Sequence, residues 1–387
     1  MRRKLIQAIL LMILICTVMQ PSAYGVDGNV EWKNTNPSTA PLARRSAGMA
    51  YDSGSDLIIL FSGRDPDLPS AYGDTWTLDV DTNIWTNVTP ENSPPPRGTM
   101  GGFEYDSDSD RVIFFGGVKQ LDPFICWEDT WAFNCDTETW ENMTPASGPR
   151  GTALHAMAYD SGSDRIIMYG GMWDDRDVSS ETWSYHYDSN TWTNMSPDVS
   201  PGLLYAFGFA YDSESDRIIL FGGKYRDDSG EEIKDETWSY NFDTNTWTKM
   251  NPPVKPAPRE RFQMTYHAGW DRVVLFGGDK NNFNPIYDET WLYDFNNDKW
   301  TQLSLETHPT GRVYAGLAYD NESECIVLFG GMDAMMDVFG DMWILSNTTP
   351  STPPSTNPLP LPEWWWLVLG AGAVVLVLVA FVYVRKQ

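Results

Sequence analysis

The sequence predicts an all-β fold, a six-bladed β-propeller whose ring is closed by a strand near the N-terminal end. Three observations predict this class. One unit of about 50 residues occurs six times, and the first five units each offer four strand-like segments. The sixth unit lacks a fourth strand, which residues 30–37 could supply. Four-stranded sheets repeated around an axis leave only short, protected edges, which is the propeller architecture.

The repeated unit is clearest in residues 159–197, YDSGSDRIIMYGGMWDDRDVSSETWSYHYDSNTWTNMSP. It begins with a Tyr-Asp turn of the form DSxSD, in which Asp and Ser favour local hydrogen bonds to the backbone. An apolar strand follows and ends at Gly-Gly, where glycine permits positive φ. The tyrosine that opens each unit is called the anchoring tyrosine here, and it occurs at Tyr51, Tyr105, Tyr159, Tyr211, Tyr266 and Tyr319.

After a variable loop, each unit continues with two further strands. The segment WSYHYD alternates large and polar residues, as a third strand should. The fourth strand carries a tryptophan, and residues 30–37 align with residues 190–197 so that Trp32 matches Trp192. We therefore expect residues 30–37 to form the outer strand of the last blade, which would remove two exposed sheet edges.

Gly-Gly, an aromatic strand and a tryptophan seven residues after its tyrosine (Tyr185 to Trp192) resemble the Kelch repeat over about residues 30–346. The resemblance implies a Kelch-type β-propeller of the superfamily of the galactose oxidase central domain. Galactose oxidase has a copper site built from Tyr, His and a Tyr crosslinked to Cys, and no matching set of residues occurs in this sequence. We therefore assign no catalytic residue, no metal ligand and no cofactor. Calcium at the DSxSD turns stays open as an alternative.

Recurring charged residues receive a structural interpretation. The Glu that precedes Thr-Trp (Glu181, Glu236, Glu289) and the Arg that opens the second strand (Arg111, Arg165, Arg217, Arg272) could pair within or between blades. The chain as a whole is acidic, with 53 Asp and Glu against 27 Lys and Arg and a formal charge of −26. Such a field repels phosphate backbones and argues against a nucleic-acid partner.

The two ends predict export and membrane attachment. Residues 1–25 have the basic, apolar and small-residue regions of a signal peptide, with an uncleaved anchor as the alternative. Residues 26–346 form the propeller, and the Pro-, Ser- and Thr-rich residues 347–363 form a stalk. Residues 364–384 are an uncharged apolar run of transmembrane length, and residues 385–387 follow as a cytoplasmic tail. These features predict a single-pass protein of the cell membrane with the propeller on the extracytoplasmic side, and a sorting tail is the alternative for the C-terminal end. Asn321 and Asn347 are candidate glycosylation sites.

The loop after each Gly-Gly is the stretch in which the six units differ most. Exposed aromatic and acidic residues on variable loops over a rigid scaffold favour recognition of a protein or a cell-surface glycan. The candidate ligand-binding residues are Tyr72, Phe124, Trp173, Asp174, Asp175, Tyr225, Asp227, Phe283 and Phe339. The alternative is that these side chains merely pack the loops onto the ring.

We expect an interaction or adhesion module rather than an enzyme. The rival functions are a carbohydrate-active enzyme or oxidase that uses the same face, and a structural envelope protein without catalysis. A buried carboxylate pair near the mouth of the channel would favour a hydrolase. The sequence does not predict the oligomeric state.

Overall fold

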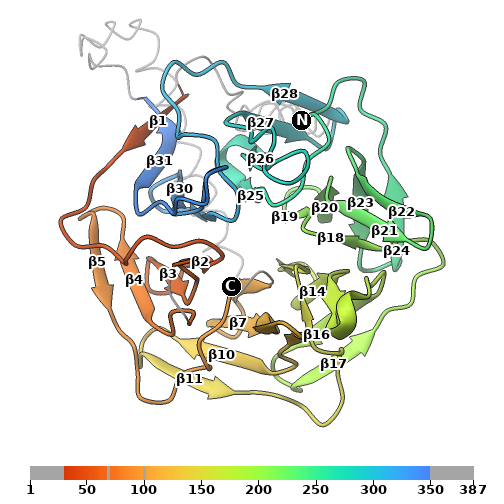
Figure 1. Cartoon of the computed structure of the whole chain (residues 1–387), viewed down its shortest axis with the longest axis horizontal. Coiled ribbons are helices and arrows are strands. Elements are labelled where there is room, and N and C mark those ends of the chain that lie inside the picture. Colours follow the sequence, from red (N-terminus) through yellow and green to blue (C-terminus); the bar gives the residue numbers. More distant parts are fainter. Residues whose placement is uncertain (1–29, 68–69, 99–101, 349–387) are drawn as a thin grey trace, which may run out of the picture. The chain divides into compact units, whose positions relative to one another are not determined.

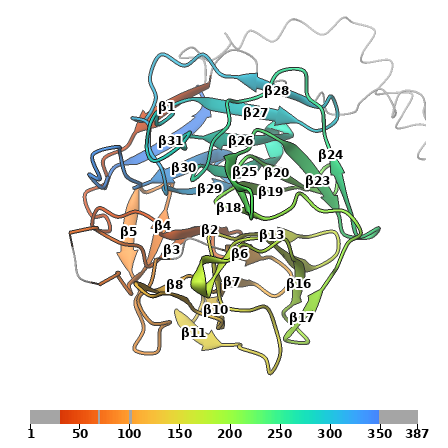
Figure 2. The same ribbon diagram turned by 45° about the vertical axis from the view of Figure 1, so that its right-hand side comes forward.

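A computed structural model describes residues 30–348 except 68–69 and 99–101. Within these residues, six four-stranded antiparallel sheets surround a common centre, as Figure 1 and the turned view in Figure 2 show. Each sheet is one blade, and the strands of a blade run from the centre outward. The blades are numbered one to six in the order of their anchoring tyrosines.

The innermost strands lead from the loop side of the ring to the DSxSD turns. They are β2 (Gly48–Asp52), β6 (Phe103–Asp106), β13 (Ala156–Asp160), β19 (Gly208–Asp212), β25 (Gln263–His267) and β29 (Gly316–Asp320). The second strands are apolar on both faces because neighbouring blades stack on them. They are β3 (Leu57–Phe61), β7 (Arg111–Phe115), β14 (Arg165–Tyr169), β20 (Arg217–Phe221), β26 (Arg272–Phe276) and β30 (Cys325–Phe329).

The third and outer strands carry the repeated tryptophans. The third strands are β4 (Thr75–Asp79), β10 (Thr130–Asn134), β16 (Thr182–His186), β23 (Thr237–Asn241), β27 (Thr290–Asp294) and β31 (Met342–Asn347). The outer strands are β5 (Ile84–Asn87), β11 (Thr139–Asn142), β17 (Thr191–Asn194), β24 (Thr246–Lys249), β28 (Lys299–Gln302) and β1 (Val30–Asn34).

Short strands build the loops after Gly-Gly and the inter-blade connections that pair with them. The loop strands are β8 (Val118–Leu121), β9 (Phe124–Cys126), β15 (Met172–Trp173), β21 (Lys224–Asp227) and β22 (Gly230–Ile233). The strands of the inter-blade connections are β12 (Thr152–Ala153) and β18 (Leu204–Tyr205). Two 3-10 turns complete the described part of the chain, η1 (Asp174–Arg176) and η2 (Ala268–Trp270). Glycine is required where the second strand ends, since a Cβ on Gly170 (φ 61°) would lie 2.5 Å from the carbonyl oxygen of Leu204.

The structure confirms that the N-terminal segment closes the ring. β1 pairs antiparallel with β31, with Trp32 opposite Leu345, and Figure 1 shows the red β1 beside the blue β31. The Trp32 side chain is 1% exposed and packs against Phe276 of the preceding blade at 5.4 Å between ring centroids. Blade six is therefore built from both ends of the described chain.

The outer-strand tryptophans also link neighbouring blades by hydrogen bonds. Each indole Nε1–H donates to the hydroxyl of the threonine that opens the third strand of the preceding blade, at 2.9–3.1 Å. The pairs are Trp32–Thr290, Trp140–Thr75, Trp192–Thr130, Trp247–Thr182 and Trp300–Thr237. Trp85 is the exception, because blade six has Met342 at the threonine position, and its Nε1 has no partner among the described residues.

The acidic residue before Thr-Trp pairs with a different arginine from the one expected. Arg44, in the connection that enters blade one, makes two bonds to the Asp74 carboxylate at 2.6 and 2.9 Å, and Trp76 donates to the same group at 2.7 Å. Arg97–Asp129, Arg259–Glu289 and Arg312–Asp341 repeat this ion pair. The second-strand arginines donate to a backbone carbonyl, as Arg165 does to Asp164 at 2.6 Å, and Arg272 also pairs with Asp294 of its own blade at 2.7 Å. The arginine that pairs with the acidic residue before Thr-Trp thus comes from the connection between blades.

The fold class and the location predicted from the apolar C-terminal run need correction. Among the described residues, no helix is long and apolar enough to cross a membrane, and the helices there are the two 3-10 turns. Over the described residues, the fold class that the structure supports is therefore an all-β propeller. The single-pass membrane location lacks its structural basis. Residues 1–25 and 364–384, on which these expectations were based, lie outside the described residues.

Candidate functional site

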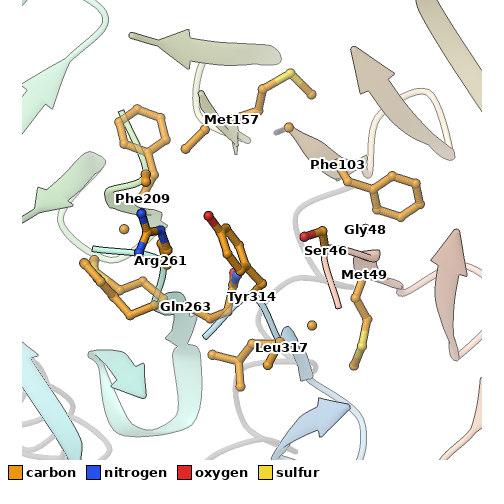
Figure 3. A pocket seen from close by; sticks show the side chains of 18 of the residues that line it. Ser46, Gly48, Met49, Phe103, Met157, Phe209, Arg261, Gln263, Tyr314 and Leu317 are labelled. Carbon is orange, nitrogen blue, oxygen red and sulfur yellow. The ribbon is translucent and has the colours of Figure 1, made fainter. Parts of the chain in front are cut away.

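Two cavities lie where the six inner strands meet. The loop-side cavity has a volume of about 140 Å³ and is lined by the first residues of these strands and the residues before them (Figure 3). The turn-side cavity has a volume of about 300 Å³ and is lined by the anchoring tyrosines. In the described residues, no group of three or more His, Cys, Asp or Glu side chains could hold a metal ion.

The mouth of the loop-side cavity is a ring of residues with positive φ. The position five residues before each anchoring tyrosine has φ between 56° and 61° in the five blades where it is described, at Ser46, Leu154, Ala206, Arg261 and Tyr314. Backbone hydrogen bonds of 2.8–3.0 Å run between successive members of this ring, from Leu154 through Ala206, Arg261 and Tyr314 to Ser46. These bonds offset the strain of left-handed backbone in residues with a Cβ.

The side chains of this ring differ from blade to blade, and two of them fill the mouth. Figure 3 shows Tyr314 at the middle of the cavity and Arg261, from the neighbouring blade, beside it. The guanidinium of Arg261 lies 3.2 Å from carboxylate oxygens of both Glu260 and Asp279. It also lies 4.9 Å from the centre of the Phe283 ring. These contacts fix the cation at the cavity wall.

Glu260 and Asp279 form a buried carboxylate pair, and both residues are 0% exposed. Burial raises the pKa of Glu260 to about 7 and also raises the pKa of Asp279. Burial alone would lower the pKa of Arg261, but Tyr314, Glu260 and Asp279 together raise it. This is the kind of buried carboxylate pair that would favour a hydrolase, and in the structure both carboxylates contact Arg261 and support its guanidinium.

Two further arginines lie close enough to Arg261 to form a group of three positive charges beside the mouth. Arg45 lies with its guanidinium 5.6 Å from the Tyr314 ring and pairs through its backbone with Arg64. Burial, together with the like charges of Arg64 and Arg261, lowers the pKa of Arg45. The Arg45 Nε has no hydrogen-bond partner among the described residues. On a chain of charge −26, this group of three arginines is suited to an anionic ligand.

Comparison with known proteins agrees with the repeat structure. The model of the KLHDC2/KLHL20/DRC7 Kelch-repeats domain matches residues 26–201, 102–304 and 197–351 in three overlapping segments. The chain belongs to the Kelch-repeat family. Nothing in the matches supports the narrower assignment to the galactose oxidase superfamily.

Two relatives share this Kelch region. The dynein alpha chain of the flagellar outer arm from Chlamydomonas reinhardtii is 23% identical over 329 residues, covering 78% of this chain and 7% of the dynein. Kelch domain-containing protein 2 from Bos taurus is 28% identical over 149 residues, covering 38% of this chain and 34% of the relative. The chain thus spans only a minor part of both relatives.

Two of the predicted loop residues cover buried arginines of the Kelch blades. The Tyr72 ring lies 4.3 Å from the Arg44 guanidinium, and the Phe339 ring lies 4.2 Å from that of Arg312. The same stacking occurs in Arg97–Trp127 and Arg259–Tyr287. A contact that recurs in four blades indicates that these two aromatic rings help to build the Kelch repeat.

Other predicted residues join neighbouring Kelch loops to one another. Phe124 is buried, and the Asp174 carboxylate accepts a hydrogen bond of 2.6 Å from the backbone N–H of Cys126. Trp173 is half-buried on β15, and the side chain of Asp175 lies outside what the structure describes. The loops of blades two and three therefore interlock at this point.

The remaining predicted residues lie on the loops of Kelch blades four and five. Tyr225 donates a hydrogen bond of 3.0 Å to Asp227, whose carboxylate also accepts from the backbone of Ser229 in a tight turn. Phe283 contacts Arg261 and is the predicted residue that the structure brings to the loop-side mouth. The other predicted residues are spread over separate loops, and their role in binding remains a prediction.

Arg45, Arg261 and Tyr314 were missed by the sequence prediction. The six Kelch units differ strongly at the fifth and sixth residues before the anchoring tyrosine, and that difference was the available signal. The glycosylation candidates lie elsewhere, since Asn321 is exposed at the turn-side cavity and Asn347 ends β31.

Proposed function

We propose that this Kelch propeller is a protein-interaction module that binds an acidic group of its partner at the loop-side mouth. Membership in the Kelch-repeat family supports the coarser statement, an interaction module. The observation that carries the finer one is the pair Arg45 and Arg261 over the Tyr314 ring, with Arg64 beside Arg45, on a chain that is otherwise strongly acidic. Arginine donates hydrogen bonds in a fork that matches a carboxylate.

A protein partner fits better than a glycan. Glycan binding was expected from exposed aromatic rings, but Tyr72 and Phe339 lie against guanidinium groups and Phe124 is buried. The mouth offers charge and a phenol in place of a flat apolar platform. A partner carboxylate, from a side chain or a chain end, would meet Arg45 and Arg261 together.

The test is peptide selection by phage display against the full chain, followed by affinity measurement with Arg45→Met and Arg261→Met. We expect selected peptides to carry acidic residues and to bind each variant about 10- to 100-fold more weakly, because a hydrogen bond to a charged group contributes about 1.5–3 kcal/mol. Arg45→Met is the safer variant, since no buried carboxylate depends on Arg45.

Arg165→Met is the matched control, because Arg165 begins a second strand at the turn side of the ring and should leave affinity unchanged. Equal binding by wild type and Arg45→Met would contradict the proposed site. Selective binding on a glycan array, with no acidic peptide selected, would favour the glycan alternative.

A further inference from the structure

Glu104 is the residue that breaks the repeat inside the channel. It occupies the middle of β6, at the position two residues after the first residue of the other inner strands. The equivalent residues are Ala50, Ala158, Ala210, Thr265 and Ala318. Four of the six blades therefore place a methyl group where blade two places a carboxylate.

Glu104 lies at the junction of the two cavities and lines both of them. Four other residues also line both cavities, and all four are apolar. This apolar belt consists of Met49, Phe209, Met264 and Leu317. No described residue forms a hydrogen bond or an ion pair with the Glu104 side chain. Burial raises the pKa of Glu104 to about 8. The side chain is half-buried between the two cavities and has gained no partner among the described residues.

The turn-side cavity leads to this carboxylate through an acidic rim. Five anchoring tyrosines donate hydrogen bonds of 2.8–3.2 Å to the aspartate five residues later, in the pairs Tyr51–Asp56, Tyr105–Asp110, Tyr159–Asp164, Tyr211–Asp216 and Tyr266–Asp271. The arginines of the channel mouth are at its opposite, loop side. Four of the five aspartates at the turn side also have an arginine within 3.7–3.9 Å, so Glu104 is the carboxylate inside the channel that has no cationic neighbour among the described residues.

We propose that the turn-side cavity binds a small alkylammonium ion, with its ammonium group on the Glu104 carboxylate and its alkyl stem against the apolar belt. One carboxylate neutralises one positive charge, whereas a Ca²⁺ or Mg²⁺ ion needs several oxygen ligands that this belt does not offer. The tyrosine rings above the belt add aromatic faces, which attract ammonium ions. This site goes beyond the proposed function, which concerns the opposite mouth.

Two carboxyls near the channel have a pKa close to neutral, Glu104 at about 8 and Glu260 at about 7, but Glu260 lies against Arg261 and lines neither cavity. His155, Arg261 and Tyr314 face Glu104 from the loop-side cavity, and the six anchoring tyrosines face it from the turn-side cavity. Burial lowers the pKa of His155 to about 3, so this imidazole is neutral. Without a bound ligand, the Glu104 carboxyl group, with its pKa of about 8, is mostly protonated at pH 7. An ammonium ion favours the ionised carboxylate, so binding releases a proton to the buffer.

The test is calorimetric titration of the full chain with n-butylammonium chloride at pH 7, in two buffers of different ionisation enthalpy. We expect saturable binding with close to one proton released per ligand. Glu104→Ala restores the residue of four other blades and should weaken binding at least tenfold. Glu104→Gln keeps the shape and should also lose binding, and thermal melting shows whether each variant is folded.

Two control ligands make the result decisive. Sodium butyrate has the same stem with the opposite charge and should give no saturable heat. Potassium chloride at equal ionic strength should give none either, and saturable heat with it would assign the site to inorganic cations and overturn the proposal. Equal binding of n-butylammonium by wild type and folded Glu104→Ala would also overturn it, while leaving the loop-side proposal untouched.

Discussion

Replacing Trp32 by alanine should destabilise the whole ring, because β1 supplies the outer strand of blade six. The indole is 1% exposed, packs against Phe276 and donates a hydrogen bond of 2.9 Å to Thr290. Truncation of a buried tryptophan costs about 3–5 kcal/mol. The loss also leaves the Thr290 hydroxyl without its donor. We therefore expect the free energy of unfolding to fall by about 4 kcal/mol.

This loss can be converted to a melting temperature. Unfolding entropy is about 2.1 cal/mol/K per residue, so a ring of about 320 residues has roughly 0.7 kcal/mol/K. A loss of about 4 kcal/mol then lowers Tm by roughly 6 °C, which differential scanning calorimetry at a fixed scan rate resolves. Thr290→Val, which removes only the acceptor, should cost about 1–3 kcal/mol.

Trp85→Ala is the matched control in blade one. Trp85 is 2% exposed and occupies the same position as Trp32, but its Nε1 has no partner among the described residues. Its truncation should therefore cost about 1 kcal/mol less than that of Trp32, the usual contribution of one hydrogen bond. A Tm of Trp32→Ala within 1 °C of the wild type would refute the closure of the ring by β1.

Two further stability predictions follow from buried charges. The raised pKa of Glu104, about 8 against its usual 4.5, means that the folded state holds this proton more tightly; its contribution to stability is fully present below pH 4.5 and is lost as the pH rises toward 8. The difference in unfolding free energy between Glu104→Ala and the wild type should therefore grow from pH 5 to 8, by at most about 5 kcal/mol at about 1.4 kcal/mol per pKa unit, and a flat difference in urea melts would contradict it. In the same assay, Arg312→Met should lower the free energy of unfolding by about 2–4 kcal/mol, because it leaves the Asp341 carboxylate without its ion pair. Arg217 is half-exposed, so Arg217→Met should change this free energy by no more than about 0.5 kcal/mol. Equal losses in the two variants would contradict the role of the inter-blade arginine.

Much of the fold could be predicted because the same sequence pattern occurs in six successive units. The DSxSD turns form as expected, with the Asp52 carboxylate accepting from the backbone of Gly54 and Ser55 at 2.9 and 3.2 Å. The missing strand could be placed because Trp32 had a counterpart in every other unit. The arginine–acid pairs were harder, since Arg44 and Asp74 are 30 residues apart and their contact depends on the path of the connection.

The candidate site could be predicted only in part. Variable loops were a reasonable place to search, and Phe283 does lie at the mouth. Tyr72 and Phe339 show why the loops were misleading, since an aromatic ring in a loop can be held by a guanidinium beneath it. No sequence pattern reports that stacking, because the arginine is about 30 residues away and belongs to the connection between blades.

The six-fold repeat supplies an internal reference for what each position needs structurally. At the Glu104 position the blades need a small side chain, as Ala50, Ala158, Ala210 and Ala318 show. A carboxylate there meets the cost of desolvation without a hydrogen bond or an ion pair from a described residue, so the fold gains nothing from it. The same comparison applies to Arg261, which requires the buried Glu260 and Asp279 for its support. Departures from the repeat that cost stability, one at the loop-side mouth and one at the junction of the two cavities, are better explained by ligands than by folding.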